Sequence, residues 1–143
     1  MLIGEYKTKL QEKNRTAIPK RFRDELEGQL IITRGYEGCL IVLDKSRWEK
    51  LIRLIETRPL TNQDVRNTKR FLVGGAAEIE FDKQGRFVLP DVLVEYAHFE
   101  NELVFVGIEN WLEVWDLETW QTKIEQITES AADIADRLSS IAL

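Results

Sequence analysis

The sequence predicts an α+β protein built from two tandem copies of one small unit, with a helix after the second copy. The segment QEKNRTAIP at residues 11–19 returns as DKQGRFVLP at residues 82–90, with Arg and Pro at the same spacing. Around both copies, apolar residues alternate as they do in half-buried strands. A stripe of apolar residues at heptad spacing then follows the second copy.

The repeat extends well beyond this segment. Aligning Arg15 with Arg86 and Pro19 with Pro90 also aligns Gly4 with Gly75. After one inserted residue, TRGYEGCLIVLDKSRW aligns with FVGIENWLEVWDLETW, and the equivalent pairs are Gly35 and Gly107, Glu37 and Glu109, Leu40 and Leu112, Asp44 and Asp116, and Trp48 and Trp120. We therefore predict a first repeat at residues 4–48 and a second at residues 75–120.

Each repeat is expected to begin with two strands joined by a tight turn. EYKTKL and AEIEF alternate as strands, and RTAI and RFVL continue them after the turn. Asn14 and Gly85 occupy equivalent turn positions, and these two residue types best tolerate a positive φ. Pro19 and Pro90 end the second strand, because proline has no N–H to donate to a ladder.

The second part of each repeat is predicted to be a short helix followed by a hairpin. PKRFRDEL and PDVLVEYA place Pro in the first turn of a helix. The hairpins turn at residues 36–38 and 109–110. Asp44 and Asp116 follow them, and each is expected to cap the next helix.

Two further helical segments complete the predicted organisation. The connector at residues 49–74 is expected to form two helices broken at Pro59, with Thr61 and Asp64 as a capping pair. Residues 121–143 are expected to form an amphipathic C-terminal helix. Its stripe consists of Trp120, Ile124, Ile127, Ala131, Ile134, Leu138 and Ile141. Periodicity leaves open whether this stripe packs on its own chain or on another subunit.

Charge is divided unequally between the two halves. Residues 1–74 carry 16 Lys and Arg against 10 Asp and Glu, whereas residues 75–143 carry 4 against 15. The net charges of +6 and −11 favour a polyanion as the partner of the first half. The acidic half would then repel the polyanion or meet the basic end of a neighbouring subunit. No apolar run approaches the ~20 residues of a membrane span. The single Cys39 cannot form an internal disulfide, which suits a reducing cytosol, and we expect a cytoplasmic protein.

Enzymatic chemistry is not expected from this sequence. His98 is the only histidine, and no Cys or His cluster has zinc-ligand spacing. VGGAAE at residues 73–78 lacks the remaining positions of a phosphate-binding loop. Cys39 lies within GCLIVL, so we predict a buried strand thiol. We therefore expect no catalytic residues, metal, cofactor or small-molecule substrate.

Both repeats and the connector resemble the MraZ family of bacterial transcriptional regulators. The resemblance is carried by GEYKTKLQEKNRTAIPKRFR, TRGYEGCLIVL, PLTNQDVRNTKRFLVGGAAEIEFDKQGRFVLP and VGIENWLEVWD. It implies a fold of the AbrB/SpoVT swapped-hairpin group, in which two repeats interleave as a pseudo-symmetric, double-psi-like β-barrel with flanking helices. It also implies ring-like homo-oligomers that bind double-stranded DNA upstream of the cell-division and cell-wall gene cluster, usually as repressors of their own operon, and hence an association with the nucleoid.

The recurrent motif of this family is Asp, three residues, then Arg. The second repeat keeps it as Asp82 and Arg86, whereas Gln11 stands at the Asp position before Arg15, and Asn14 replaces the usual Gly. An Asp four residues before an Arg can hold its guanidinium as an ion pair. Gln11 cannot neutralise Arg15. We therefore expect Asp82–Arg86 to be a structural tie and Arg15 to be available to DNA, the alternative being that Arg15 also supports its turn.

The candidate DNA contacts lie in the basic first repeat. Arg15 and Lys13, near the turn, are the candidates for contacts with base edges. The expected backbone contacts are Lys7, Lys9, Lys20, Arg21 and Arg23. Two alternatives remain open, namely an oligomeric interaction protein without specific DNA binding and an antitoxin-like module. The operator sequence and ring size are not predicted.

Overall fold

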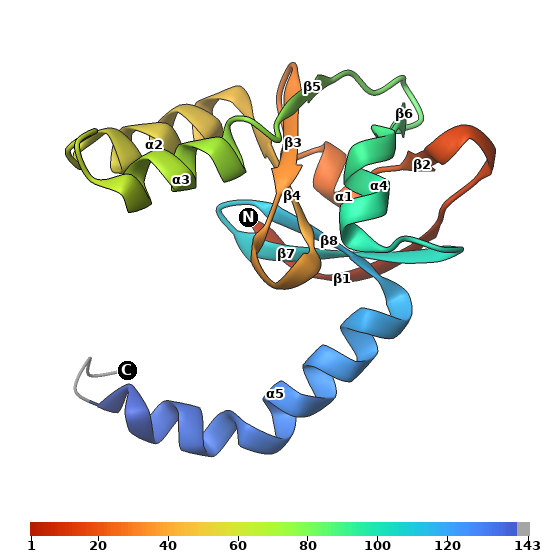
Figure 1. Ribbon diagram of the computed structural model, residues 1–143. Coiled ribbons are helices and arrows are strands. Elements are labelled where there is room, and N and C mark those ends of the chain that lie inside the picture. Colours follow the sequence, from red (N-terminus) through yellow and green to blue (C-terminus); the bar gives the residue numbers. More distant parts are fainter. Residues whose placement is uncertain (140–143) are drawn as a thin grey trace.

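The computed structural model describes residues 1–139 as an antiparallel sheet with helices on both faces (Figure 1). The strands are β1 (Leu2–Lys9), β2 (Arg15–Ala17), β3 (Leu30–Arg34), β4 (Leu40–Asp44), β5 (Ala77–Ile79), β6 (Arg86–Val88), β7 (Glu102–Glu109) and β8 (Leu112–Asp116). The helices are α1 (Lys20–Arg23), α2 (Lys45–Glu56), α3 (Gln63–Leu72), α4 (Asp91–Ala97) and α5 (Leu117–Arg137).

The strands of the two repeats interleave. Six of them form one sheet in the order β1-β7-β8-β4-β3-β5, and β2 pairs with β6 as a separate ladder. The first strand of each repeat therefore pairs with the hairpin of the other, β1 with β7 and β5 with β3. This exchange confirms the predicted swapped-hairpin arrangement of two tandem repeats.

The pairing register contains a pseudo-two-fold axis. At the centre of the β4–β8 ladder Ile41 lies opposite Glu113, with the pairs Leu40–Val114 and Val42–Leu112 on either side. The β2–β6 ladder has the same symmetry, because Arg15 pairs with Val88 and Ala17 pairs with Arg86. The axis therefore relates equivalent residues in both ladders.

The register corrects one part of the sequence alignment. Arg34 pairs with Leu40, whereas Gly107 pairs with Leu112, so Arg34 and Gly107 are the equivalent residues. Gly35 is not the counterpart of Gly107. The cause is a difference in turn length, since the first hairpin turns over Tyr36–Gly38 and the second over two residues, with Ile108 N–H donating to Trp111 O. Both turn positions agree with the sequence prediction.

Over residues 1–139, the sheet does not close into the β-barrel that the resemblance implies, although the swapped hairpins are present. Within residues 1–139, β1 and β5 form the edges of the sheet, and neither is joined to the other or to a full strand on its outer side. The short strands β2 and β6 pair with each other, with only the single bridge Gln11–Arg15 beside them. Pro19 and Pro90 follow these strands and stop them after a few residues.

Alternation along the strands sends apolar residues to two cores. On one face Ile32, Val42 and Phe105 pack with Phe22 of α1 and Leu93 of α4. On the other face, the α2–α3 pair covers one end of the sheet and the first turns of α5 cover another. The α2–α3 cluster contains Ile41, Leu43 and Leu72 with Trp48, Leu51, Ile55, Phe71 and Trp111.

Two of the predicted helix caps differ in the structure. Asp44 caps α2 as expected, because its carboxylate accepts from Arg47 N–H. Asp116 instead accepts from the backbone N–H of Glu100 and makes no side-chain cap with α5. At the start of α3, the cap is Asn62, which accepts from Asp64 N–H, rather than Thr61.

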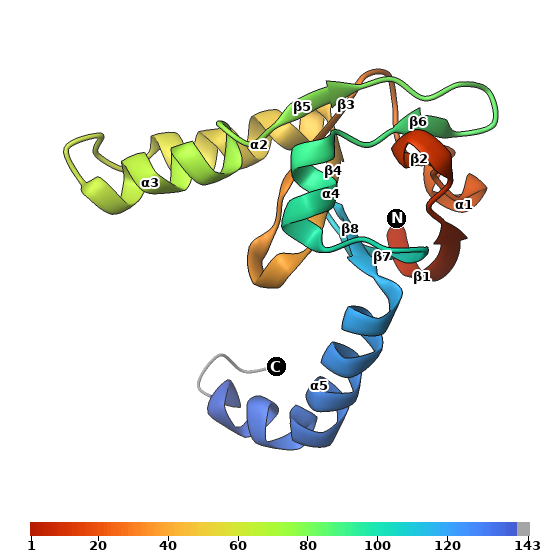
Figure 2. The ribbon, with the colours of Figure 1, turned by 45° about the vertical axis from the view of Figure 1, so that its right-hand side comes forward.

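Helix α5 leaves the body at β8 and extends away from it (Figures 1 and 2). Trp120 is 7% exposed and packs against Trp115, and its indole N–H donates to Glu5 at 2.7 Å. Ile141 of the predicted stripe lies outside the described residues. Among residues 1–139, no helix combines the length and apolar character needed to cross a bilayer.

Candidate nucleic-acid interface

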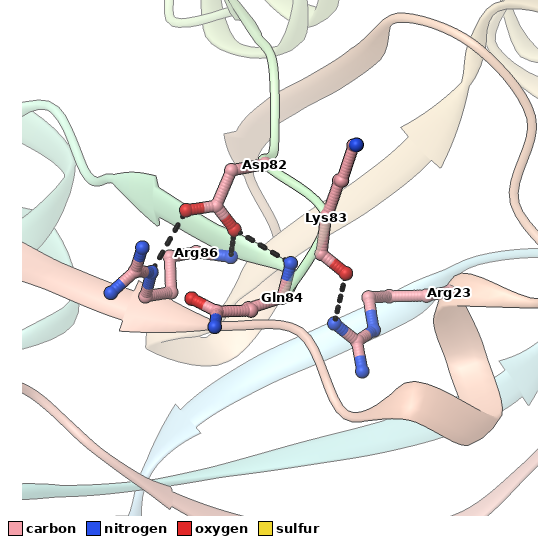
Figure 3. Close-up of polar contacts among 5 residues, drawn as sticks. All are labelled: Arg23, Asp82, Lys83, Gln84 and Arg86. Atoms are coloured by element: carbon pink, nitrogen blue, oxygen red, sulfur yellow. Dashed lines mark hydrogen bonds and ion pairs between the residues drawn. The ribbon is translucent and has the colours of Figure 1, made fainter.

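The turn of the second repeat is organised by Asp82 (Figure 3). One carboxylate oxygen accepts from the backbone N–H groups of Gln84 and Arg86. The other accepts from Arg86 Nε at 2.8 Å, which completes an ion pair. Gly85 has a φ of +79°, so the turn uses the conformational freedom of glycine. The predicted Asp82–Arg86 tie is therefore present in the structure.

These contacts favour the ionised form of Asp82. The backbone N–H of Arg86, followed by its guanidinium, holds the pKa of the Asp82 carboxyl below its ordinary value of 3.8. Arg86 consequently faces a carboxylate that stays charged at neutral pH, and part of its own charge is compensated.

The equivalent turn of the first repeat is closed by the same backbone hydrogen bond but lacks the ion pair. Gln11 N–H donates to Arg15 O at 2.7 Å, as Asp82 N–H does to Arg86 O at 3.1 Å. Within residues 1–139, however, the Arg15 guanidinium makes no ion pair or hydrogen bond, and Arg15 is exposed. The two arginines therefore share a backbone position but differ in the compensation of their charge.

Asn14 adds a contact that joins the two repeats. It has a φ of +57°, the left-handed conformation that its position requires. Its side-chain amide donates to Asp91 at the start of α4. The backbone carries the same link in both directions, because Leu89 N–H donates to Asn14 O and Ile18 N–H donates to Gly85 O, each at 2.8 Å.

The other predicted cations are spread over three elements. Lys13 lies in the turn beside Asn14 and also has a positive φ, of +61°. Lys20, Arg21 and Arg23 lie on α1, directly after Pro19. Arg23 is already engaged, because its guanidinium donates to Lys83 O in the turn of the second repeat at 3.3 Å (Figure 3).

Lys7 and Lys9 occupy a different position from the turn cations. They are exposed residues of the edge strand β1. Because they are two residues apart on a strand, their side chains point to the same side of it. The structure thus places Lys13 and Arg15 together at the turn, with α1 following it in the chain, and Lys7 and Lys9 on the adjoining strand.

A groove of about 610 Å³ lies beside Arg15 and is otherwise lined by residues of the acidic repeat. Arg15 and Arg86 line it together with Glu78, Glu80 and Asp82. Like charges at its acidic side oppose a phosphate there, so an approaching polyanion meets the most favourable charge on the Lys13–Arg15 side.

Comparison with known families agrees with this duplicated geometry. The family model described as "MraZ protein, putative antitoxin-like" matches residues 1–71 and matches again over residues 72–140. The chain belongs to the MraZ family. The two matched regions contain one swapped-hairpin repeat each. Membership of the MraZ family supports a DNA-binding regulatory function at the level of the family.

Some contacts of this MraZ-family chain were not foreseen from the sequence. The bonds from Asn14 to Asp91 and from Arg23 to Lys83 join residues that are 77 and 60 positions apart. The internal repeat was the one feature of the sequence that could have predicted these contacts, since it implies that the equivalent turns of the two repeats face each other. Cys39 is 1% exposed as predicted, and burial followed by the charge of Glu113 raises the pKa of its thiol to about 12.

Proposed function

We propose that this protein is a sequence-specific DNA-binding transcriptional regulator that contacts its operator through the turn of the first repeat. The observation that carries the proposal is the uncompensated guanidinium of Arg15, at a position where Arg86 of the other repeat is held by Asp82. A free guanidinium can donate two parallel hydrogen bonds to the O6 and N7 atoms of a guanine. Phosphate groups can be bound by lysines as point charges and by other arginines.

The cations around Arg15 divide into two roles. Lys13 lies in the same turn, and we assign it with Arg15 to base edges. Lys20 and Arg21 on α1 are assigned to phosphates, which position a protein without reading sequence. Lys7 and Lys9 on β1 extend this basic surface. Arg23 has a smaller role, because it already donates to Lys83 O.

A single turn supplies few contacts, so we further propose a ring-like homo-oligomer that engages repeated DNA boxes. Linked weak sites bind far more tightly than one site when their spacing allows simultaneous contact. The expected operator lies upstream of the protein's own cell-division and cell-wall operon, with repression as the expected outcome and the nucleoid as the expected location. We expect no enzymatic activity.

The family description also contains the term antitoxin-like, which keeps a second function open. An antitoxin of this hairpin type would neutralise a toxin with an extended segment after the hairpin. Here residues 117–137 form the continuous helix α5. We therefore favour the regulator, and co-expression with a candidate toxin that restores growth would favour the alternative.

The first experiment measures fluorescence anisotropy on a labelled duplex from upstream of the protein's own gene, with a scrambled duplex as the control. Binding should prefer the native duplex and weaken as salt rises, by about 0.9 logarithmic units per tenfold change in salt for each phosphate neutralised. Arg15→Ala should remove the preference. Equal affinity for both duplexes at every salt concentration would refute sequence-specific binding.

A matched pair of substitutions tests the neutralisation of Arg15. Gln11→Asp recreates in the first repeat the ion pair seen in the second, so DNA affinity should fall although the fold and the cation are unchanged. Asp82→Gln is the mirror substitution. It frees Arg86, which stands among Glu78 and Glu80, so DNA affinity should hardly change. An unchanged affinity in Gln11→Asp would refute the neutralisation idea.

A further inference from the structure

Helix α5 exposes an apolar face that its own chain covers only at the start. Trp120 is buried and Ile124 packs beside it, but farther along Ile127 and Leu138 are each 38% exposed. The packing contacts of α5 with the body are made to β7 and β8, near the first turns of the helix. Figures 1 and 2 show the remaining turns projecting from the body. The later part of the stripe is therefore available to another surface.

The uncharged face is wider than a coiled-coil seam. Beside the heptad stripe lie Thr128, Ser130 and Ala135, at the positions where a two-stranded coiled coil usually carries charged residues. From Ile127 to Leu138, at 100° per residue, the uncharged face spans about 160° of the helix, whereas Lys123 lies on the same face nearer the start of α5. The hydroxyls of Thr128 and Ser130 donate to carbonyls of their own helix, at 2.7 and 2.8 Å. These flanks can therefore be buried without losing a hydrogen bond to water.

Helices α2 and α3 form a groove of the matching kind. It has a volume of about 470 Å³ and lies between the two helices. Its apolar lining includes Trp48, Ile52 and Val73, and Val73 is 44% exposed. Lys69 and Arg70 line the same groove, with Glu56 as the one carboxylate. A helix seated between two others is covered on a broader face than a helix in a pair, which suits the width of the α5 face.

The charges of the two surfaces are complementary. Residues 45–72, from the start of α2 to the end of α3, contain eight Lys or Arg and three Asp or Glu, a net of +5. Helix α5 contains two Lys or Arg and five Asp or Glu, a net of −3. Glu125 and Asp133 lie on the polar face, about 60° beyond the two borders of the uncharged face. The opposite net charges of the two surfaces favour their association.

We propose that α5 of one copy seats its uncharged face in the α2–α3 groove of a second copy. The anchor formed by Trp120, Trp115 and Glu5 holds the start of α5 on its own body, and the two elements leave the body at separate places (Figure 1). The contact joins two different surfaces, so it repeats from copy to copy and closes only as a ring. This inference names the surfaces through which the proposed homo-oligomer would assemble, and it rests on that part of the proposed function.

Disulfide trapping without DNA tests the contact directly. Ile127→Cys and Ile134→Cys chains are each mixed with Ile52→Cys or Val73→Cys chains and oxidised. The parent chain is the background control, because Cys39 is buried. We expect a disulfide-linked dimer in at least one mixture, at a yield several-fold above that of either variant alone.

Three results would overturn the proposal. Equal linkage of the α5 variants alone would show that α5 pairs with α5. Closure within a single Val73→Cys/Ile134→Cys chain, without linkage between chains, would place α5 on its own groove. No linkage in any mixture of an assembled parent protein would place the contact elsewhere.

Light scattering on charge variants separates this inference from the proposed function. Ile127→Glu should reduce the assembly toward the 16.7 kDa monomer, with an unchanged circular dichroism spectrum. Thr122→Glu adds the same charge on the opposite face of α5 and should leave the mass unchanged. An Ile127→Glu protein that keeps the full assembled mass would refute the contact. A groove variant Val73→Glu that keeps the assembled mass but loses DNA binding would refute it as well. An assembled parent that fails to bind DNA refutes only the proposed function.

Discussion

Equivalent residues of the two repeats perform different tasks, and the two aspartates after the hairpins show this most clearly. Asp44 is 5% exposed and caps α2, and it also pairs with the guanidinium of Arg47. Asp116 is 8% exposed and accepts instead from the backbone N–H of Glu100. Duplication preserved the residue type, while the local hydrogen-bond partner came to differ.

The first prediction concerns the Asp44 cap. Asp44→Ala should lower the free energy of unfolding by about 1–2 kcal/mol, because it leaves an N–H of α2 without its acceptor. Urea unfolding monitored by circular dichroism measures this loss. Asp44→Asn keeps an oxygen acceptor and should lose less. Equal losses in the two variants would show that the charge pair with Arg47, rather than the cap, carries the effect.

The second prediction concerns the ionisation of Asp82. Its pKa is depressed in the folded state, so the ordered turn is favoured above the unfolded value of 3.8 and loses this contribution as the pH falls through the folded pKa. Carbon-13 NMR titration of the side-chain carboxyl should give a pKa below 3.8 in the parent. In Arg86→Ala the pKa should rise towards that value. A value at or above 3.8 in the parent would contradict the geometry.

At the scale of elements, the sequence predicted the features that depend on the backbone preferences of single residues. Asn14 and Gly85 were recognised as turn residues because few residue types accept a positive φ, and both have one. The predicted caps at Thr61 and Asp116 were wrong, since several residues near a helix start can accept a hydrogen bond and packing selects among them. The Gly35–Gly107 equivalence failed because turn length changed between the repeats.

The third prediction concerns the stability of α5 along its length. In a monomeric variant, backbone amides after Ile127 should exchange with deuterium much faster than those near Trp120, because only the first turns pack on the body. Hydrogen exchange with mass spectrometry resolves the two parts. The assembled parent should protect both. Uniform protection in the monomer would mean that the rest of the helix has a partner within its own chain.

At the scale of the whole molecule, the first strand of each repeat pairs with a strand of the other repeat. No local pattern in the sequence indicated that β1 would pair with β7, or that β5 would pair with β3. The repeat and the family resemblance predicted the exchange of strands between the repeats. They did not predict that the sheet would remain open. Arg15 and Lys13 were selected by charge and turn position, and both lie at the turn, while their contact with DNA stays a prediction.

The fourth prediction follows from this exchange of strands. Residues 1–71 and 72–140, produced separately, should each be largely unfolded, because each lacks the strands that complete its sheet. Mixing them should restore the native circular dichroism spectrum and a cooperative thermal transition. The intact chain under the same conditions is the reference. A cooperative transition in either half alone would contradict interdependence of the repeats.

The strand order β1-β7-β8-β4-β3-β5 reads the same from either end once the repeats are exchanged. Two identical chains in this arrangement would carry identical surfaces on both sides of the axis, with no way to tell one side from the other. Joining them into one chain removes that constraint. The two repeats can then differ in charge, as the net charges of +6 in residues 1–74 and −11 in residues 75–143 show. The molecule thereby has two halves of different chemistry, which two identical chains in the same arrangement could not have.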